Sequence, residues 1–92
     1  MSEPLTRTVT IVNQRGLHAR AASKFASTAG QFKSDVSVEK DGQTVTGVSI
    51  MGLMMLAAGI GSDITINVRG EDAREAIDTL TALVEARFGE NE

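Results

Sequence analysis

Asp63-Ile64-Thr65-Ile66-Asn67-Val68-Arg69 alternates polar and apolar side chains over seven residues. Alternation with a period of two is typical of a β-strand that buries one face, so this stretch predicts a strand with its apolar side toward a core. Gly70 ends the pattern. The next residues predict a helix, because their apolar side chains recur on one face: Ala73, Ala76, Ile77, Leu80, Leu83 and Val84. Three acidic residues suit its positive N-terminal end: Glu71, Asp72 and Glu75.

The residues before this strand predict a short helix. Ser49 precedes an apolar run over residues 50–57, and serine in front of such a run is a favourable N-cap. Gly52 lies inside the run, and we expect the helix to end near Gly59-Ile60-Gly61.

A hairpin is predicted before that helix. Val36 and Val38 alternate with polar neighbours, and residues 43–46 form a second short strand. Asp41-Gly42 between them is a signal for a type I′ turn, in which both central residues have positive φ.

The N-terminal third predicts a strand followed by a helix. Residues 8–12 are all β-branched, and 13–16 are typical of a loop. An apolar stripe at helical spacings of three and four follows, formed by Ala22, Phe25, Ala26 and Ala29. We expect this helix to begin near His18. Gly30 stands where a left-handed residue usually ends a helix. The order β-α-β-β-α-β-α predicts a two-layer α+β fold, with helices over one side of a mostly antiparallel sheet.

Composition limits the classes of protein to consider. At 92 residues, with 41% hydrophobic and 23% charged residues, the chain predicts one globular domain over 1–92, with residues 89–92 frayed. A net charge of −3 argues against a nucleic-acid binder. With no cysteine and one histidine, disulfides, thiol chemistry and the familiar zinc sites are excluded, and we expect neither metal nor cofactor.

The chain shows no sign of a membrane or export segment. A long stretch without charge or amide, residues 45–62, is interrupted by four glycines. The N-terminus lacks the basic-then-apolar pattern of a signal peptide. We therefore expect a cytoplasmic protein without membrane contact. We also expect it to be a monomer.

Charge is uneven along the chain. Residues 1–34 carry five basic side chains against one acidic, a net charge of +4, and residues 63–92 carry a net charge of −5. This favours an anionic group or acidic partner surface near the N-terminal elements, although a solvated distribution without a role explains it equally well.

The single histidine lies at the predicted junction of the first strand and helix. There His18 would sit over backbone N–H groups without acceptors, with Arg20 in the same first turn. These groups suit an anion, and a phosphoryl group on the imidazole would be held by them. The alternative is an exposed capping residue without chemistry.

Two motifs resemble a known family. Gly16-Leu17-His18-Ala19-Arg20 is similar to the active-centre signature of HPr, the histidine-containing phosphocarrier family of the phosphoenolpyruvate-dependent phosphotransferase system. Residues 47–54 resemble its second signature, around a regulatory serine. The resemblance covers nearly the whole chain and implies an open-faced β-sandwich with strand order 1-4-2-3.

The resemblance also implies roles for residues and partners. His18 would accept a phosphoryl group from enzyme I on Nδ1 and pass it to EIIA or EIIB-type proteins, with Arg20 as the active-centre arginine. Ser49 would be the target of HPr kinase/phosphorylase. One departure is Ala21, where the family usually has proline. Both residues suit the first turn of a helix.

The predicted second helix is too apolar for one buried stripe. We expect part of it to be an exposed surface for docking partners, formed by Ile50, Met51, Leu53 and Met54. The alternative is that this whole run is core.

Three hypotheses about function follow. The first is a stoichiometric phosphoryl carrier, which is not an enzyme. The second is a regulatory phosphoprotein of the nitrogen-related phosphotransferase branch, and the third a ferredoxin-like binding module without phosphorylation.

Overall fold

The computed structural model describes residues 4–92, which form strands, helices and a terminal 3₁₀ turn. The elements in chain order are β1 (Leu5–Thr10), α1 (Ala19–Ala29), β2 (Asp35–Lys40), β3 (Gln43–Thr46), α2 (Ile50–Met55), β4 (Asp63–Arg69), α3 (Ala73–Glu85) and η1 (Arg87–Gly89). The predicted order β-α-β-β-α-β-α is confirmed, and η1 extends it by one short turn.

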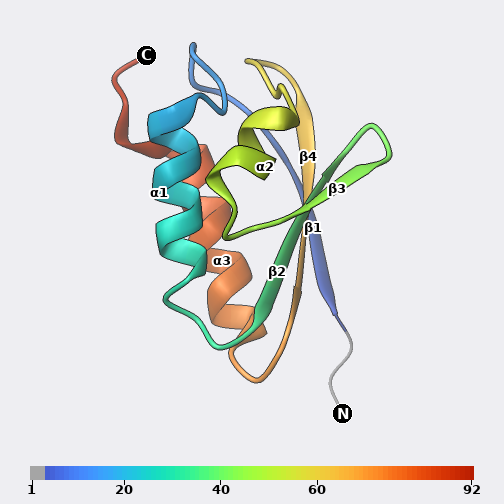
Figure 1. Cartoon of the computed structure of the whole chain (residues 1–92). Coiled ribbons are helices and arrows are strands. Elements are labelled where there is room, and N and C mark those ends of the chain that lie inside the picture. The colour runs from blue at the N-terminus through green and yellow to red at the C-terminus, as the bar shows by residue number, and fades with distance from the viewer. Residues whose placement is uncertain (1–3) are drawn as a thin grey trace.

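The four strands form one antiparallel sheet in the order β1-β4-β2-β3. The strand with the clearest sequence pattern, β4, lies between β1 and β2, where Ile66 pairs with Arg7 on one side and Val38 on the other. The helices cover one face of this sheet and leave the other open (Figure 1). The predicted α+β open-faced β-sandwich is therefore confirmed, including the strand order.

The two faces of the sheet differ as the alternation in β4 predicts. Its apolar side chains, Ile64, Ile66 and Val68, are fully buried beneath the helices. Its polar side chains make cross-strand hydrogen bonds with β1 on the open face: Thr6 with Asn67 at 2.8 Å, Thr8 with Thr65 at 3.1 Å and Thr10 with Asp63 at 2.6 Å.

The first strand begins three residues earlier than the sequence predicts. β1 begins at Leu5, because Leu5 pairs with Val68 at the far end of β4, and it ends at Thr10, which pairs with Asp63. The β-branched run over residues 8–12 is a local pattern and carries no information about the partner strand. Pairing with β4 determines where β1 begins and ends.

The two helix ends also differ from expectation. Gly30 has a φ of −67°, so it is right-handed, because its N–H donates to the Ala26 carbonyl and the chain continues in a tight right-handed turn. The second helix ends at Met55, short of residues 59–61, and the left-handed residue there is Ala57, with a φ of 53°. The type I′ turn is confirmed, since Asp41 and Gly42 both have positive φ.

Candidate functional site

The loop before α1 is held against the loop that follows α2. Gly16 has a φ of 65°, and a Cβ atom on it would lie 2.4 Å from the carbonyl oxygen of Ala58. The next residue, Leu17, donates its N–H to that same oxygen at 2.9 Å. Only glycine combines this backbone conformation with so close an approach, so Gly16 fixes the direction in which the chain enters α1.

His18 is the N-cap residue of α1. Its backbone is extended, and its carbonyl oxygen accepts the first helical hydrogen bond, from Ala22 N–H at 2.8 Å. Its side chain makes no capping hydrogen bond. The first N–H groups of the helix therefore point toward the His18 end without helical acceptors, which favours negative charge there.

The imidazole of His18 contacts a carboxylate from the far end of the chain. His18 Nε2 lies against Oε2 of Glu90, and the two side chains are only 21% and 16% exposed. The amide of Asn13 donates to the other oxygen, Oε1, at 3.0 Å. Hydrogen bonds from Asn13 and then His18 lower the pKa of Glu90, so this carboxylate is ionised at neutral pH.

Residues 89–92, which the sequence predicts to be frayed, lie against the site in the structure. Phe88 is fully buried, and the main-chain oxygen of Glu92 accepts from Gln14 N–H at 2.9 Å. Neither Asn13 nor Glu90 lies in a motif that predicts a site residue. The available signal was Phe88, a large apolar residue beyond the stripe of α3 that required a place in the core.

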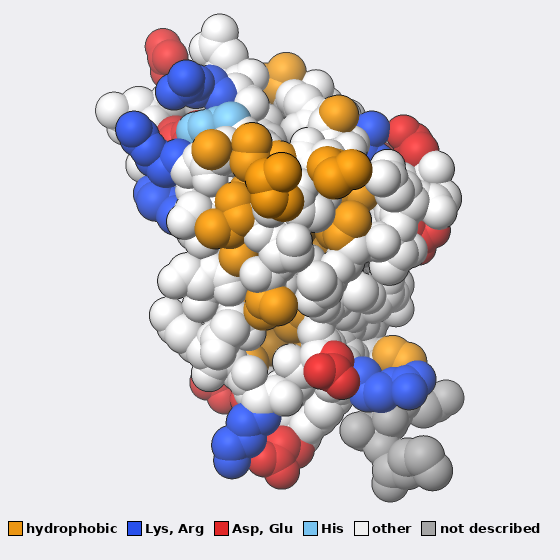
Figure 2. All heavy atoms as spheres, viewed as in Figure 1, with side chains coloured by type: hydrophobic (Ala, Val, Ile, Leu, Met, Phe, Trp, Pro, Cys, Tyr) orange, Lys and Arg blue, Asp and Glu red, His pale blue; other side chains and the backbone are white. Residues whose placement is uncertain are grey.

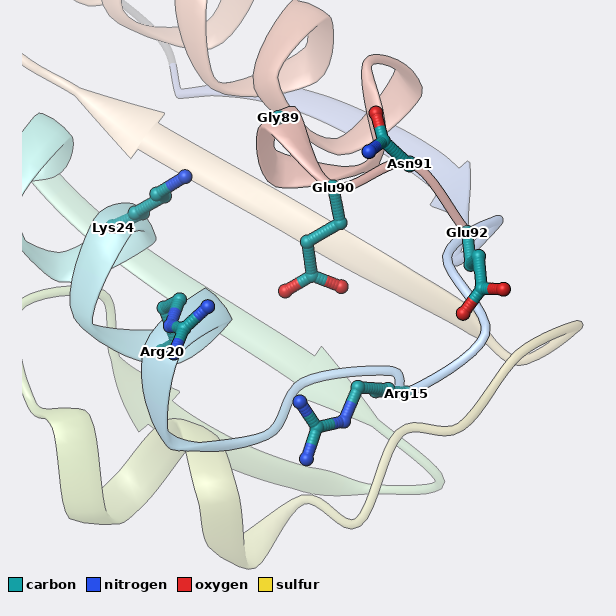
Figure 3. A pocket seen from close by; sticks show the side chains of 7 residues that line it. All are labelled: Arg15, Arg20, Lys24, Gly89, Glu90, Asn91 and Glu92. Atoms are coloured by element: carbon teal, nitrogen blue, oxygen red, sulfur yellow. The ribbon is translucent and has the colours of Figure 1, made fainter.

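A pocket of about 480 Å³ opens beside this contact. Its lining combines three basic residues with the C-terminal segment: Arg15, Arg20, Lys24, Gly89, Glu90, Asn91 and Glu92. Figure 3 shows the Glu90 carboxylate pointing into the space between Lys24 and Arg20 on one side and Arg15 on the other. The three basic side chains exceed the two carboxylates, Glu90 and Glu92, by one positive charge, so this opening suits a further anionic group.

Arg20 is the second residue of α1 and is exposed. Within residues 4–92 its guanidinium makes no salt bridge, and it lines the pocket near His18. It is therefore available to an anion that arrives from outside.

Ser49 begins the second helix as predicted. Its hydroxyl accepts a hydrogen bond from Gly52 N–H at 2.9 Å, which is the N-cap bond of α2. A Cβ atom on Gly52 would lie 3.1 Å from that hydroxyl oxygen, so glycine leaves room for the cap.

An exposed apolar patch surrounds α2. We define it by its exposed side chains: Val48, Ile50, Met51, Met54, Met55 and Ile60. Figure 2 shows apolar side chains gathered on this face beside the histidine, with basic side chains along the adjoining edge. Leu53 was predicted to be part of this surface, and that prediction is wrong. It is fully buried, because its position on α2 faces the core that α2 shares with α1.

The fold and the site together define a small open-faced β-sandwich protein that presents a histidine at a helix N-terminus beside basic side chains. The family model described as "PTS HPr component phosphorylation site" matches residues 5–86. The chain is 52% identical over 88 residues to the phosphocarrier protein HPr of Cupriavidus necator, covering 96% of this chain and 99% of that protein.

Two solved structures agree with the match. HPr-C-His from Thermoanaerobacter tengcongensis has a TM-score of 0.91 at 42% identity, covering 96% of this chain and 99% of that one. An HPr dimer from the same organism has a TM-score of 0.76 at 43% identity, covering 98% and 100%. The chain belongs to the HPr family of phosphocarrier proteins of the phosphotransferase system. This membership decides against a binding module without phosphorylation.

No helix within residues 4–92 has both the length and the apolar character needed to cross a membrane.

Proposed function

We propose that this phosphocarrier uses His18 as its phosphoryl acceptor and donor. The observation that carries the proposal is the N-cap position of an imidazole that makes no capping bond and adjoins a pocket with three basic side chains. A histidine that merely capped α1 would direct its ring at the helix N–H groups. Here the ring leaves those groups available for phosphoryl oxygens.

The transfer step follows from this geometry. The lone pair of His18 Nδ1 forms a bond to phosphorus, and the bond between phosphorus and the donor breaks. Arg20 and the first N–H groups of α1 compensate the charge of the transferred group. The reverse step on an acceptor protein returns His18 to its starting state, so the protein is a stoichiometric carrier and not an enzyme.

Phospho-enzyme I is the proposed donor, and EIIA or EIIB-type proteins are the proposed acceptors. The apolar patch, without Leu53, is the proposed docking surface, because Met51 and Met54 are adaptable side chains beside His18. Its basic edge suits partners with acidic rims.

Ser49 is the proposed site of regulation by HPr kinase/phosphorylase. A phosphate there would lie at the N-terminus of α2, where negative charge is favourable, and beside exposed Ile50 in the apolar patch. The fold would tolerate the modification while docking would be weakened.

We further propose that the protein acts in the cytoplasm as a monomer. The related HPr dimer makes the oligomeric state a point to measure, and light scattering at the concentration used for transfer decides it. A dimer at that concentration would contradict the proposal that the protein acts as a monomer.

Incubation with phosphoenolpyruvate and enzyme I, followed by intact-mass measurement, tests the main proposal. We expect the gain of one acid-labile phosphoryl group, located on His18 by fragmentation under conditions that preserve phosphohistidine. Uptake at any other residue would contradict the assignment of His18.

A further inference from the structure

Glu90 is held in place from both sides along the chain. Before it, Phe88 is fully buried, and Lys24 Nζ donates to the Phe88 carbonyl at 2.7 Å. After it, the main-chain oxygen of Glu92 accepts from Gln14 N–H at 2.9 Å. The segment that carries Glu90 is therefore fixed to α1 and to the loop before α1, the two elements that place His18.

Asn13 fixes the orientation of the Glu90 carboxylate. Asn13 is fully buried, and its amide donates to the Gly16 carbonyl at 2.9 Å and to Glu90 Oε1 at 3.0 Å. Turning this amide around would place its oxygen against two acceptors, so both N–H groups must face as they do. In the described part of the chain its own buried oxygen has no hydrogen-bond partner, which is the cost of presenting both donors.

The remaining oxygen of Glu90 contacts Nε2 of His18. An ionised carboxylate only accepts hydrogen bonds, so Nε2 must carry a hydrogen and donate it. In a neutral imidazole with its hydrogen on Nε2, the lone pair lies on Nδ1.

We propose that Glu90 is a positioning residue that holds His18 in the Nε2–H tautomer and so presents Nδ1 as the nucleophile. This inference rests on the proposed role of His18 as phosphoryl acceptor. When Nδ1 forms its bond to phosphorus and the bond to the donor breaks, Nε2 keeps its hydrogen beside Glu90. No proton has to leave the ring before the transfer, and the tautomer that reacts is the one already held.

The variant Glu90→Gln inverts this preference. Asn13 requires an oxygen at the position it faces, so the glutamine must direct its NH₂ group at His18. That group donates, and the imidazole then accepts on Nε2 and carries its hydrogen on Nδ1. We expect the rate of His18 phosphorylation by phosphoenolpyruvate and enzyme I to fall about tenfold, the lower end of effects seen for residues that orient a functional imidazole.

The direct readout is the tautomer itself. Long-range ¹H–¹⁵N spectra of the ¹⁵N-labelled protein, recorded at about pH 8 where an ordinary imidazole is neutral, distinguish Nε2–H from Nδ1–H. We expect Nε2–H in the wild type and Nδ1–H in Glu90→Gln. Glu90→Ala, which removes the acceptor without adding a donor, should give a mixture and an intermediate rate.

Glu85→Gln is the matched control, because Glu85 is an exposed glutamate at the end of α3 and makes no salt bridge within residues 4–92. It removes the same charge and should leave both tautomer and rate unchanged. Thermal melts of all variants, followed by circular dichroism, check that each is folded.

An unchanged Nε2–H tautomer in Glu90→Gln would overturn the proposal, whatever happened to the rate. Equal slowing in Glu90→Gln and Glu85→Gln would also overturn it, because net charge alone would then explain the effect. Failure of the wild type to take up phosphate would refute the proposed function separately, and the spectra would still decide whether Glu90 holds the tautomer.

Discussion

The N-termini of α1 and α2 begin with residues of opposite behaviour. The Ser49 hydroxyl caps its own helix by accepting from Gly52 N–H at 2.9 Å. The His18 side chain makes no such bond, and its ring contacts Glu90 from the far end of the chain. A side chain used for capping stabilises its helix, whereas one turned away from the cap leaves the helix N–H groups available to a ligand. The comparison separates a residue important for folding from one available for chemistry.

The sharpest test of this difference replaces each residue by alanine. His18→Ala should abolish phosphoryl uptake from enzyme I, because it removes the nucleophile. The protein should still fold, because no capping bond is lost and Glu90, which loses its contact with His18, keeps the hydrogen bond from Asn13. Ser49→Ala should still take up phosphate on His18, while losing the cap and about 1 kcal/mol of stability. Intact mass and urea unfolding measure the two effects. An acid-labile phosphoryl group on the His18→Ala protein would refute the assignment.

The next largest effect is expected for Arg20. Arg20→Ala removes charge compensation from the pocket and leaves the helix N–H groups, so transfer should slow about tenfold without stopping. The expected fall in rate is smaller than the fall seen when a hydrogen-bond donor is removed from an enclosed active site, because Arg20 is exposed.

Arg74→Ala is its control, as Arg74 is an exposed arginine in the first turn of α3. The loss in Arg20→Ala should shrink as salt rises, because mobile ions screen exposed charges. Equal rates in the two variants would show that Arg20 acts only through net charge.

A smaller effect is expected at the start of α2. Ser49→Asp keeps an acceptor at the N-cap and adds a negative charge beside the apolar patch. The melting temperature should stay near that of the wild type, and His18 phosphorylation should slow several-fold, more at low salt. Ser49→Asn, which caps without charge, is the control. Equal rates in both variants would confine Ser49 to its role as a cap.

The fold was predictable where a pattern lies within one element. The alternation in β4 and the stripe of α1 each bury one face, and local periodicity is sufficient to predict both. Element ends were less predictable when a distant partner sets them, as β4 does for β1. Leu53 shows the same limit on a single side chain, because in a helix of six residues the buried face depends on what the helix packs against.

The candidate site was predictable only for those residues that lie in local motifs. His18, Arg20 and Ser49 lie within short motifs that a reader of the sequence can find. Glu90 lies 72 residues from His18, and its contact depends on the burial of Phe88 and the buried amide of Asn13. No local pattern predicts a contact at that separation, whereas packing determines it directly.

The smallest effect, on stability alone, concerns the same position in both helices, three residues after the N-cap. In α2 this is Gly52, whose N–H donates to Ser49, and in α1 it is Ala21, for which His18 provides no capping acceptor. Ala21→Pro therefore removes no capping bond. It also restricts the unfolded chain, so we expect the free energy of unfolding to rise by between zero and about 1 kcal/mol.

Gly52→Pro should instead lower the free energy of unfolding by at least about 1 kcal/mol, because it removes the donor of the α2 cap. Urea unfolding of both variants measures the difference. A marked loss in Ala21→Pro would show that the buried surroundings of Ala21 do not accommodate the larger ring, and that packing at this turn outweighs the missing cap.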